Sequence, residues 1–278
     1  SSKSVKRAAL WALGSLGSSA SKHTSAVEGF LEDKDADLVA EACTAVGGLR
    51  GANAASQLEA KLTSPFVEVA VAACMALAAM DAGADAVKKL LSNSEPRLRA
   101  ASVTALTSMT QAATFVGDAA NLVGDGDCFV RVAAAEMVRA VGSTAAAHAP
   151  AIGKFLGAKE KGVQAAAAAA LAGLGEGAAS QAEALAKLLE TKGEDISSLP
   201  LATVGVVAKV SPIYRKPACA AAVALGAIGS AGAKYARQVG ELLKDRDPDI
   251  RCYSLSALGA MGMEGAKFES QVMDSLSD

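Results

Sequence analysis

The sequence predicts an all-α protein built from repeated pairs of helices, and three observations lead to this expectation. Hydrophobic residues make up 51% of the 278 residues while aromatic residues make up 4%, so Ala, Val and Leu supply most of the apolar content. Alanine has the highest intrinsic helix propensity. An Ala-rich apolar segment recurs along the chain, and glycines follow many of its copies, where helices commonly end.

The repeated segment ends in Ala-Leu-Gly-x-Leu-Gly or a variant of it. We call its penultimate large apolar residue the marker of each copy. The markers are Leu13, Val46, Leu77, Leu106, Val138, Leu171, Leu225 and Leu258. By subtraction, successive markers are 33, 31, 29, 32, 33, 54 and 33 residues apart. A period near 30 residues with one interruption indicates a repeat architecture.

Each copy has helical periodicity, and a shorter segment between most copies has it too. The first copy places apolar residues at helical spacing on one face: Val5, Ala8, Ala9, Ala12, Leu13 and Leu16. The shorter segments cover residues 26–31, 55–62, 84–91, 145–156, 181–189, 234–243 and 268–276. Two helices per period predict a right-handed α-solenoid of about eight helix pairs, which occupies residues 1–278 as one domain.

Residues 242–262 carry a family resemblance. They read Leu-Leu-Lys-Asp-x-Asp-Pro-Asp-Ile-Arg and end in Ala-Leu-Gly-x-Met-Gly, which closely resembles a HEAT (armadillo-like) repeat. The short period and Ala-rich second helix are similar to the compact repeats of bilin-lyase-type proteins. The resemblance covers nearly the whole chain and implies the fold. It does not specify the function, because HEAT proteins include transport receptors, phosphatase scaffolds, assembly factors and a few enzymes.

An aspartate lies six residues before an arginine in two copies, as Asp125/Arg131 and Asp245/Arg251. In the family such pairs link neighbouring repeats, so the resemblance implies a structural ladder. The alternative is a basic stripe that binds phosphate or acidic peptides. That stripe would be interrupted, because the equivalent places hold Val39, Ala70, Gln164 and Ala218.

The period fails at residues 191–217, where residues 191–200 are turn-like, 201–210 are strongly apolar and 211–217 are expected to be extended. We expect a degenerate repeat whose additional helix packs in the core. The alternative is a protruding element that docks a partner, since loops on rigid scaffolds often carry function. Tyr214 and Arg215 have the residue types favoured in interface hot spots, which makes them candidate partner contacts.

The position two residues before each marker is expected to face the inner surface of the array. It holds Trp11, Thr44, Met75, Thr104, Glu136, Ala169, Val223 and Ser256. A row of small and nearly uncharged residues suits close approach of a helix or another subunit. Trp11, Met75 and Glu136 are therefore further candidate partner contacts, although Trp11 is equally explained as a packing residue.

The sequence carries no recognised residue pattern for catalysis or cofactor binding. His23 and His148 lack neighbours at metal-ligand spacing, and the repeated His-Glu pairs of the iron-dependent HEAT hydroxylases do not occur. Residues 124–127 resemble a fragment of a calcium loop but lack its remaining ligands. The chain has no phosphate-binding loop motif and no nucleophile motif. We therefore expect no catalytic residue, no metal, no cofactor and no small-molecule substrate.

Charge and cysteine content limit the classes of partner and the cell compartment that we expect for this protein. The net charge is −2, so no strong field attracts nucleic acid or an anionic membrane. No uninterrupted apolar run reaches the length of a membrane span. Five cysteines without a CxxC pair suggest reduced thiols and an intracellular, reducing location, with the compartment itself undetermined.

These observations favour a non-enzymatic scaffold or adaptor that binds other proteins within a larger assembly. The sequence opens inside a second helix and closes with a first helix, from which we expect a longer array or ends covered by neighbours. Two alternatives stay open: a bilin-lyase-like protein that handles a chromophore, and a HEAT protein that binds nucleic acid or phosphoinositides.

Overall fold

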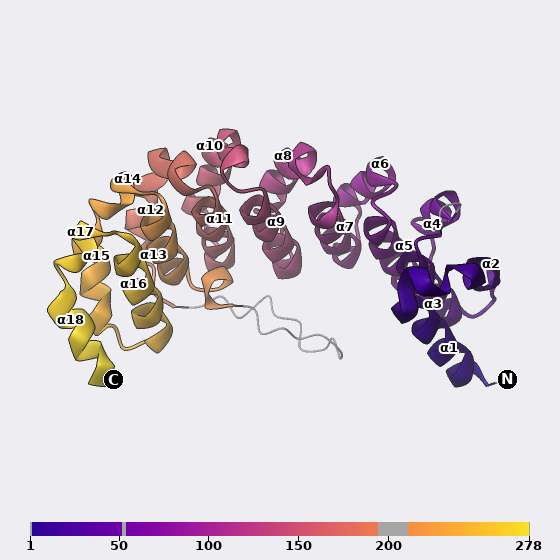
Figure 1. The fold of residues 1–278 in the computed structure, drawn as a ribbon. Coiled ribbons are helices and arrows are strands. Elements are labelled where there is room, and N and C mark those ends of the chain that lie inside the picture. The colour runs from indigo at the N-terminus through magenta and orange to yellow at the C-terminus, as the bar shows by residue number, and fades with distance from the viewer. Residues whose placement is uncertain (1, 52–53, 194–210, 278) are drawn as a thin grey trace. The chain divides into compact units, whose positions relative to one another are not determined.

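A computed structural model describes residues 2–51, 54–193 and 211–277 of the chain. The described residues form helices and turns, with no β-strand among them. They divide into two compact units, residues 1–115 and 116–278, and the division falls inside α8. Figure 1 shows the helices in chain order.

The first unit contains four long helices, which pack one against the next in sequence order: α1 (Lys3–Leu16), α3 (Ala36–Leu49), α5 (Val67–Ala79) and α7 (Pro96–Ser108). Shorter helices alternate with them: α2 (Thr24–Glu28), α4 (Ala55–Lys61) and α6 (Ala84–Lys88). The helix α8 (Ala112–Leu122) follows α7. The long helices contain the markers. In this unit the three markers after Leu13 are fully buried: Val46, Leu77 and Leu106. This alternation confirms the predicted two-helix repeat.

The second unit continues the same alternation. Its long helices are α9 (Cys128–Val141), α11 (Lys161–Gly173), α13 (Pro217–Ala227) and α16 (Pro248–Ala260), again packed in sequence order. Its shorter helices are α10 (Ala149–Gly153), α12 (Ala182–Leu188), α14 (Ser230–Ala233), α15 (Ala236–Glu241), α17 (Met263–Ala266) and α18 (Glu269–Asp274). One apolar core, rich in alanine and leucine, runs through the unit.

Short 3-10 helices begin or end many of the repeats. They are η1 (Gly17–His23), η2 (Gly29–Glu32), η3 (Lys89–Ser92), η4 (Gly142–His148), η5 (Lys154–Gly157), η6 (Gly175–Gln181), η7 (Pro212–Tyr214), η8 (Leu242–Lys244) and η9 (Ser275–Ser277). Glycine permits the sharp change of direction after a long helix. Gly17 and Gly142, the C-caps of α1 and α9, have φ values of 60° and 69°, which L side chains rarely adopt.

Acidic side chains start several of the long helices. Asp35, Asp127 and Asp247 each accept hydrogen bonds from backbone N–H groups in the first turn of the helix that follows, as N-cap residues do. The acidic turns that precede these long helices are therefore also their start signals.

Two features differ from the sequence-based expectation. The helix α8 was not anticipated, because Gly117 and the β-branched Thr114 and Val116 lower its helix propensity. Residues 211–217 were expected to be extended, but they contain the 3-10 turn η7. The turn was expected at 191–200, and its part from residue 194 on lies outside the described residues, as does the additional helix expected at 201–210.

Candidate functional site

A groove crosses three neighbouring long helices of the first unit. It has a volume of about 310 Å³ and is lined by Trp11, Gly14, Ser15, Thr44, Ala45, Gly48, Ala72, Met75, Ala76 and Ala79. These residues recur at intervals of three or four on α1, α3 and α5, so one face of each helix contributes. The lining contains no charged side chain, and it includes two of the residues anticipated as partner contacts.

Trp11 and Met75 are the large exposed side chains of this groove. Trp11 is 65% exposed and Met75 is 40% exposed, whereas Ala45 and Ala76 between them are nearly inaccessible. Exposed apolar side chains that cluster at one place mark interaction sites more often than scattered ones do. The packing interpretation of Trp11 does not fit its exposure.

Glycines bring the helices of the groove unusually close together. A Cβ atom added to Gly14 would lie 2.8 Å from the Cα atom of Ala45, and one added to Gly47 would lie 2.7 Å from the Cα atom of Ala76. Such distances leave no space for even a methyl group. The groove floor is therefore formed largely by backbone and alanine methyl groups, and the backbone of a bound segment can approach it closely.

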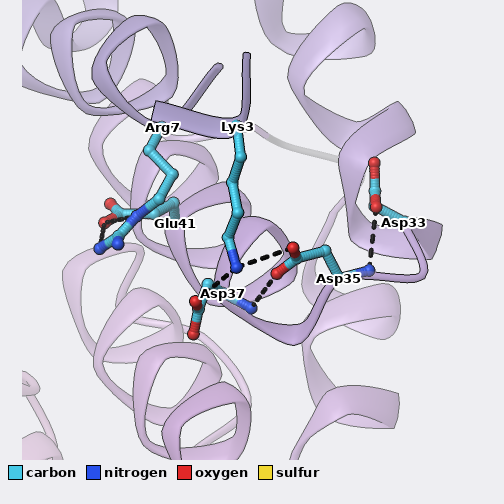
Figure 2. Close-up of polar contacts among 6 residues, drawn as sticks. All are labelled: Lys3, Arg7, Asp33, Asp35, Asp37 and Glu41. Atoms are coloured by element: carbon cyan, nitrogen blue, oxygen red, sulfur yellow. Dashed lines mark hydrogen bonds and ion pairs between the residues drawn. The ribbon is translucent and has the colours of Figure 1, made fainter. Parts of the chain in front are cut away.

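Ion pairs join the same helices at their first turns. The Lys3 ammonium lies 2.7 Å from a carboxylate oxygen of both Asp35 and Asp37, and the Arg7 guanidinium lies 2.8 Å from Glu41, as Figure 2 shows. The hydrogen bonds that Lys3 donates to Asp35 and Asp37 raise the pKa of Lys3 and lower that of Asp35. Lys3 and Arg7, in the first half of α1, are thus paired with carboxylates of the next repeat.

Figure 2 also shows how the turn before α3 presents these acids. Asp33 accepts a hydrogen bond from the backbone N–H of Asp35, and Asp35 accepts one from that of Asp37. The alternating acids hold the turn in shape while Asp35 and Asp37 bind Lys3 of the preceding long helix. The same contacts therefore cap one helix and connect two repeats.

In the second unit the structure brings together two residues that the sequence separates by 78 positions. The Tyr214 hydroxyl, in η7, donates a hydrogen bond to the Glu136 carboxylate on α9. Tyr214 is only 7% exposed, and burial, followed by the bond to Glu136, raises its pKa. Tyr214 therefore connects η7 to α9 within the second unit, and its ring does not lie on a surface open to a partner.

The neighbouring candidates have different surroundings. Arg215, next to Tyr214, is half-buried. Glu136 keeps its side chain 54% exposed and lies 3.8 Å from Arg139. Ala169, which was expected in the exposed inner row, is instead buried. The helix α11 that carries Ala169 packs against η7, which explains the difference.

The two arginines of the expected ladder make similar hydrogen bonds. Arg131 donates from Nη1 to the backbone carbonyls of Asp125 and Gly126, both at 2.9 Å, and Arg251 donates in the same way to Asp245 and Arg246. These bonds close the turn before the helix that carries each arginine. The link between repeats that the family implies stays a prediction for these four residues.

Gln164 occupies the equivalent place in its repeat and makes an equivalent hydrogen bond. Its Nε2 atom donates to the carbonyl of Ala158, six residues earlier, at 2.8 Å. In the sequence, Gln164 interrupts the row of arginines that a basic stripe would need. Because the uncharged amide of Gln164 closes the turn as the arginines do, the position seven residues before the marker has a structural role that does not need a positive charge.

Other contacts join consecutive repeats of the second unit. The Lys216 ammonium lies 2.7 Å from both Asp247 and Asp249, and Lys192 pairs with Asp245. Burial alone would lower the pKa of Lys216, but its hydrogen bonds to the two aspartates raise it. The sequence did not single out this lysine, because its partners lie more than 30 residues away.

The described residues offer little for catalysis. Among them, no three His, Cys, Asp or Glu side chains converge as a metal site. Burial raises the pKa of Cys43 to about 11 and the pKa values of Cys74 and Cys219 to about 12, which opposes formation of a thiolate nucleophile at neutral pH. None of the helices searched has the length and hydrophobicity that crossing a bilayer requires.

Comparison with known proteins supports the fold. No family model and no curated protein matches the chain. Among solved structures, an importin beta structure is 15% identical over 96% of this chain with a TM-score of 0.64, and a second is 16% identical over 93% with a TM-score of 0.63. The chain spans only 40% and 38% of their lengths.

Two further solved structures are similar to the chain. An engineered protein is 19% identical over 91% of this chain and 73% of its own, with a TM-score of 0.50. The complex of CpcE and CpcF of phycocyanin lyase from Nostoc sp. PCC7120 is 19% identical over 91% of this chain and 94% of its own, but its TM-score of 0.45 carries no argument. The chain has the fold of a HEAT-type α-solenoid, and likeness at these identities shows the fold alone.

Proposed function

We propose that this chain is a non-enzymatic scaffold that binds an apolar helix of another protein in the groove of α1, α3 and α5. The observation that carries the proposal is the exposure of Trp11 and Met75 beside a floor of glycine and alanine. Aromatic residues and methionine are enriched in protein interfaces, and small residues permit close helix approach. A partner helix is the ligand that these properties suit best.

The ion pairs at the start of α1, the helix that carries Trp11, support a protein partner over nucleic acid. Lys3 and Arg7 are already bound to carboxylates of α3, so phosphate groups would have to displace these acids. Binding through apolar burial does not need free cations, and it depends weakly on salt. The scaffold interpretation therefore predicts salt-tolerant association.

The proposal can be tested by affinity capture from cells that naturally contain the protein, followed by binding measurements with the captured partner. Three forms would be compared: the wild type, Trp11→Ala with Met75→Glu, and Met263→Glu. Met263 is 88% exposed and lies outside the groove, so its variant is a matched control. We expect the wild type and the control to bind the same partner, and the groove variant to lose at least about 2 kcal/mol of binding free energy, as hot-spot residues do.

Trp11 also provides a direct signal, because it is the single tryptophan of the chain. Burial of its ring by the partner should shift its fluorescence emission to shorter wavelength. A partner that binds the groove variant as tightly as the wild type, or that leaves the emission unchanged, would refute the groove as the binding site.

A further inference from the structure

The exposure of Trp11 and Met75 follows from their place in the repeat. Both occupy the position two residues before a marker, which we call the pre-marker position. Thr44 on α3 and Thr104 on α7 hold it in their repeats and are exposed as well. The helices α3 and α5 each have a long helix packed on both sides, so the pre-marker position stays open even between repeats. The groove is therefore open because of the repeat packing itself.

Thr44 presents a hydrogen-bond acceptor on the middle helix of the groove. Its hydroxyl lies 3.1 Å from the backbone carbonyl of Ala40 and donates its proton to that oxygen, because a carbonyl can only accept. The lone pairs of Thr44 Oγ1 are thus left for an incoming group. A bound segment that brings a donor to this point gains a hydrogen bond, and one that brings another acceptor does not.

The other lining residues limit the kind of donor that fits. The lining contains no carboxylate, so a lysine or arginine of the partner would lose its hydration without gaining an opposite charge. An amide side chain would bring two N–H donors and a carbonyl to a groove that offers only hydroxyl groups and the indole of Trp11. A tyrosine hydroxyl brings one donor at the end of an apolar ring, which matches one acceptor within an apolar lining.

Trp11 and Met75 suit the ring of such a tyrosine. They lie on α1 and α5, the helices on either side of the one that carries Thr44. Aromatic rings stabilise one another in offset or edge-to-face pairs, and a thioether sulfur makes favourable contacts with the edge of a ring. The floor between them includes Ala45 and Gly48, whose small size lets a ring approach the backbone.

The second unit of the chain contains a tyrosine bound in a similar way. Tyr214, in η7, donates its hydroxyl proton to Glu136, which holds the pre-marker position of α9. The turn η7 packs against α11 and α13, and the hydroxyl of Ser211 at its start lies 3.1 Å from that of Tyr253 on α16. Tyr214 is buried in this contact. A tyrosine hydroxyl that bonds an acceptor at the pre-marker position is thus a contact that this repeat supports.

We propose that the partner helix places a tyrosine between Trp11 and Met75, with its hydroxyl donating to Oγ1 of Thr44. This assignment rests on the proposed function and names the side chain by which the groove recognises its partner. Burial of the ring supplies affinity, and the hydrogen bond to Thr44 distinguishes tyrosine from phenylalanine.

The test uses two synthetic helical peptides that differ at one position. Each has alanine and leucine on one face and charged residues on the other. The apolar face carries a central tyrosine in the first peptide and a phenylalanine in the second. Binding is measured by titration calorimetry and by the fluorescence of Trp11. Wild type is expected to bind the tyrosine peptide about fivefold more tightly than the phenylalanine peptide, as one hydrogen bond between neutral groups provides.

Two valine variants assign the preference to one hydroxyl. Thr44→Val keeps the shape of the side chain and removes the acceptor, so the preference for tyrosine is expected to disappear. Thr104→Val is the matched control, because Thr104 also holds a pre-marker position and donates to its own helix, to Ala100 at 2.9 Å, but does not line the groove. It should keep the fivefold preference. Circular dichroism melting checks that both variants are folded, and the comparison of the two peptides on the wild type needs no variant.

Three outcomes would overturn the tyrosine assignment. Wild type would bind the two peptides equally, or the preference for tyrosine would survive in Thr44→Val. Either result leaves the groove intact as a binding site, because both peptides would still change the emission of Trp11. The third outcome is that neither peptide binds, and the groove would then be judged by the binding of the captured partner to the Trp11 and Met75 variant.

Discussion

The close approach of the long helices yields a quantitative prediction about two equivalent glycines. Gly47 and Gly259 both follow a marker near the end of a long helix, so replacing either by alanine gains helix propensity of up to about 1 kcal/mol. Their surroundings differ. A methyl group at Gly47 would lie 2.7 Å from the Cα atom and 2.8 Å from the Cβ atom of Ala76, whereas the space at Gly259 is open.

The two substitutions should therefore have opposite effects on the free energy of unfolding. Gly259→Ala is expected to be neutral or stabilising by up to about 1 kcal/mol. At Gly47 the overpacked methyl group costs about 1 to 3 kcal/mol, which exceeds the gain in propensity. The difference between the variants isolates the packing cost, about 2 kcal/mol, because the propensity term is common to both.

Urea denaturation of dilute protein, followed by circular dichroism, measures both values, and the fluorescence of Trp11 follows the first unit separately. If Gly47→Ala stabilised the chain as much as Gly259→Ala, the long helices would be free to separate, and the interpretation of the glycines as close-contact residues would fail.

Three further outcomes can be checked. Native protein at pH 8 should react rapidly with a thiol reagent at Cys252, the one exposed cysteine among the five, and Cys252→Ser should lose this fast phase. If Cys252→Ser kept the fast phase and lost a slow one, the assigned burial of the cysteines would be contradicted. Tyr214→Phe removes the buried donor to Glu136 and should lower the free energy of unfolding by about 1 to 2 kcal/mol in chemical denaturation, whereas an unchanged value would show that the bond contributes nothing. Lys216→Met should destabilise the chain at pH 7. Burial alone would raise the pKa of Asp247, but the hydrogen bond from Lys216 lowers it, so this stabilisation is present above the ordinary aspartate pKa of 3.8 and is lost as pH falls below it. Melting curves from pH 7 to pH 3 should therefore show the difference between wild type and Lys216→Met shrinking, and a constant difference would refute the ion-pair origin.

Much of the candidate site followed from the sequence once the period was known. Counting two residues back from the marker selected Trp11 and Met75, and the structure exposes both beside one groove. The same count selected Ala169, which is buried because η7 packs on its helix. Counting positions along α11 cannot anticipate that η7, which begins 43 residues after Ala169, packs against this helix.

Local features of the sequence were enough to predict the all-helical architecture, the two helices of each repeat and many of the helix ends. These features are local: helical spacing, alanine propensity, capping acids and glycines act within a few residues of one another. The repetition of one pattern then implied that each helix pair packs on the next.

Tertiary structure alone decided which apolar and polar residues find partners. Val5 and Leu38 each lie eight residues before a marker, yet Val5 is exposed and Leu38, on the helix α3 that packs against α1 and α2, is buried. Lys216 and Tyr214 bind acids 31 to 78 residues away, and Arg131 closes its own turn. Burial and charge pairing depend on distances in space between segments that are far apart in the chain. A repeat pattern gives only the order of residues within each segment, so it does not predict these contacts.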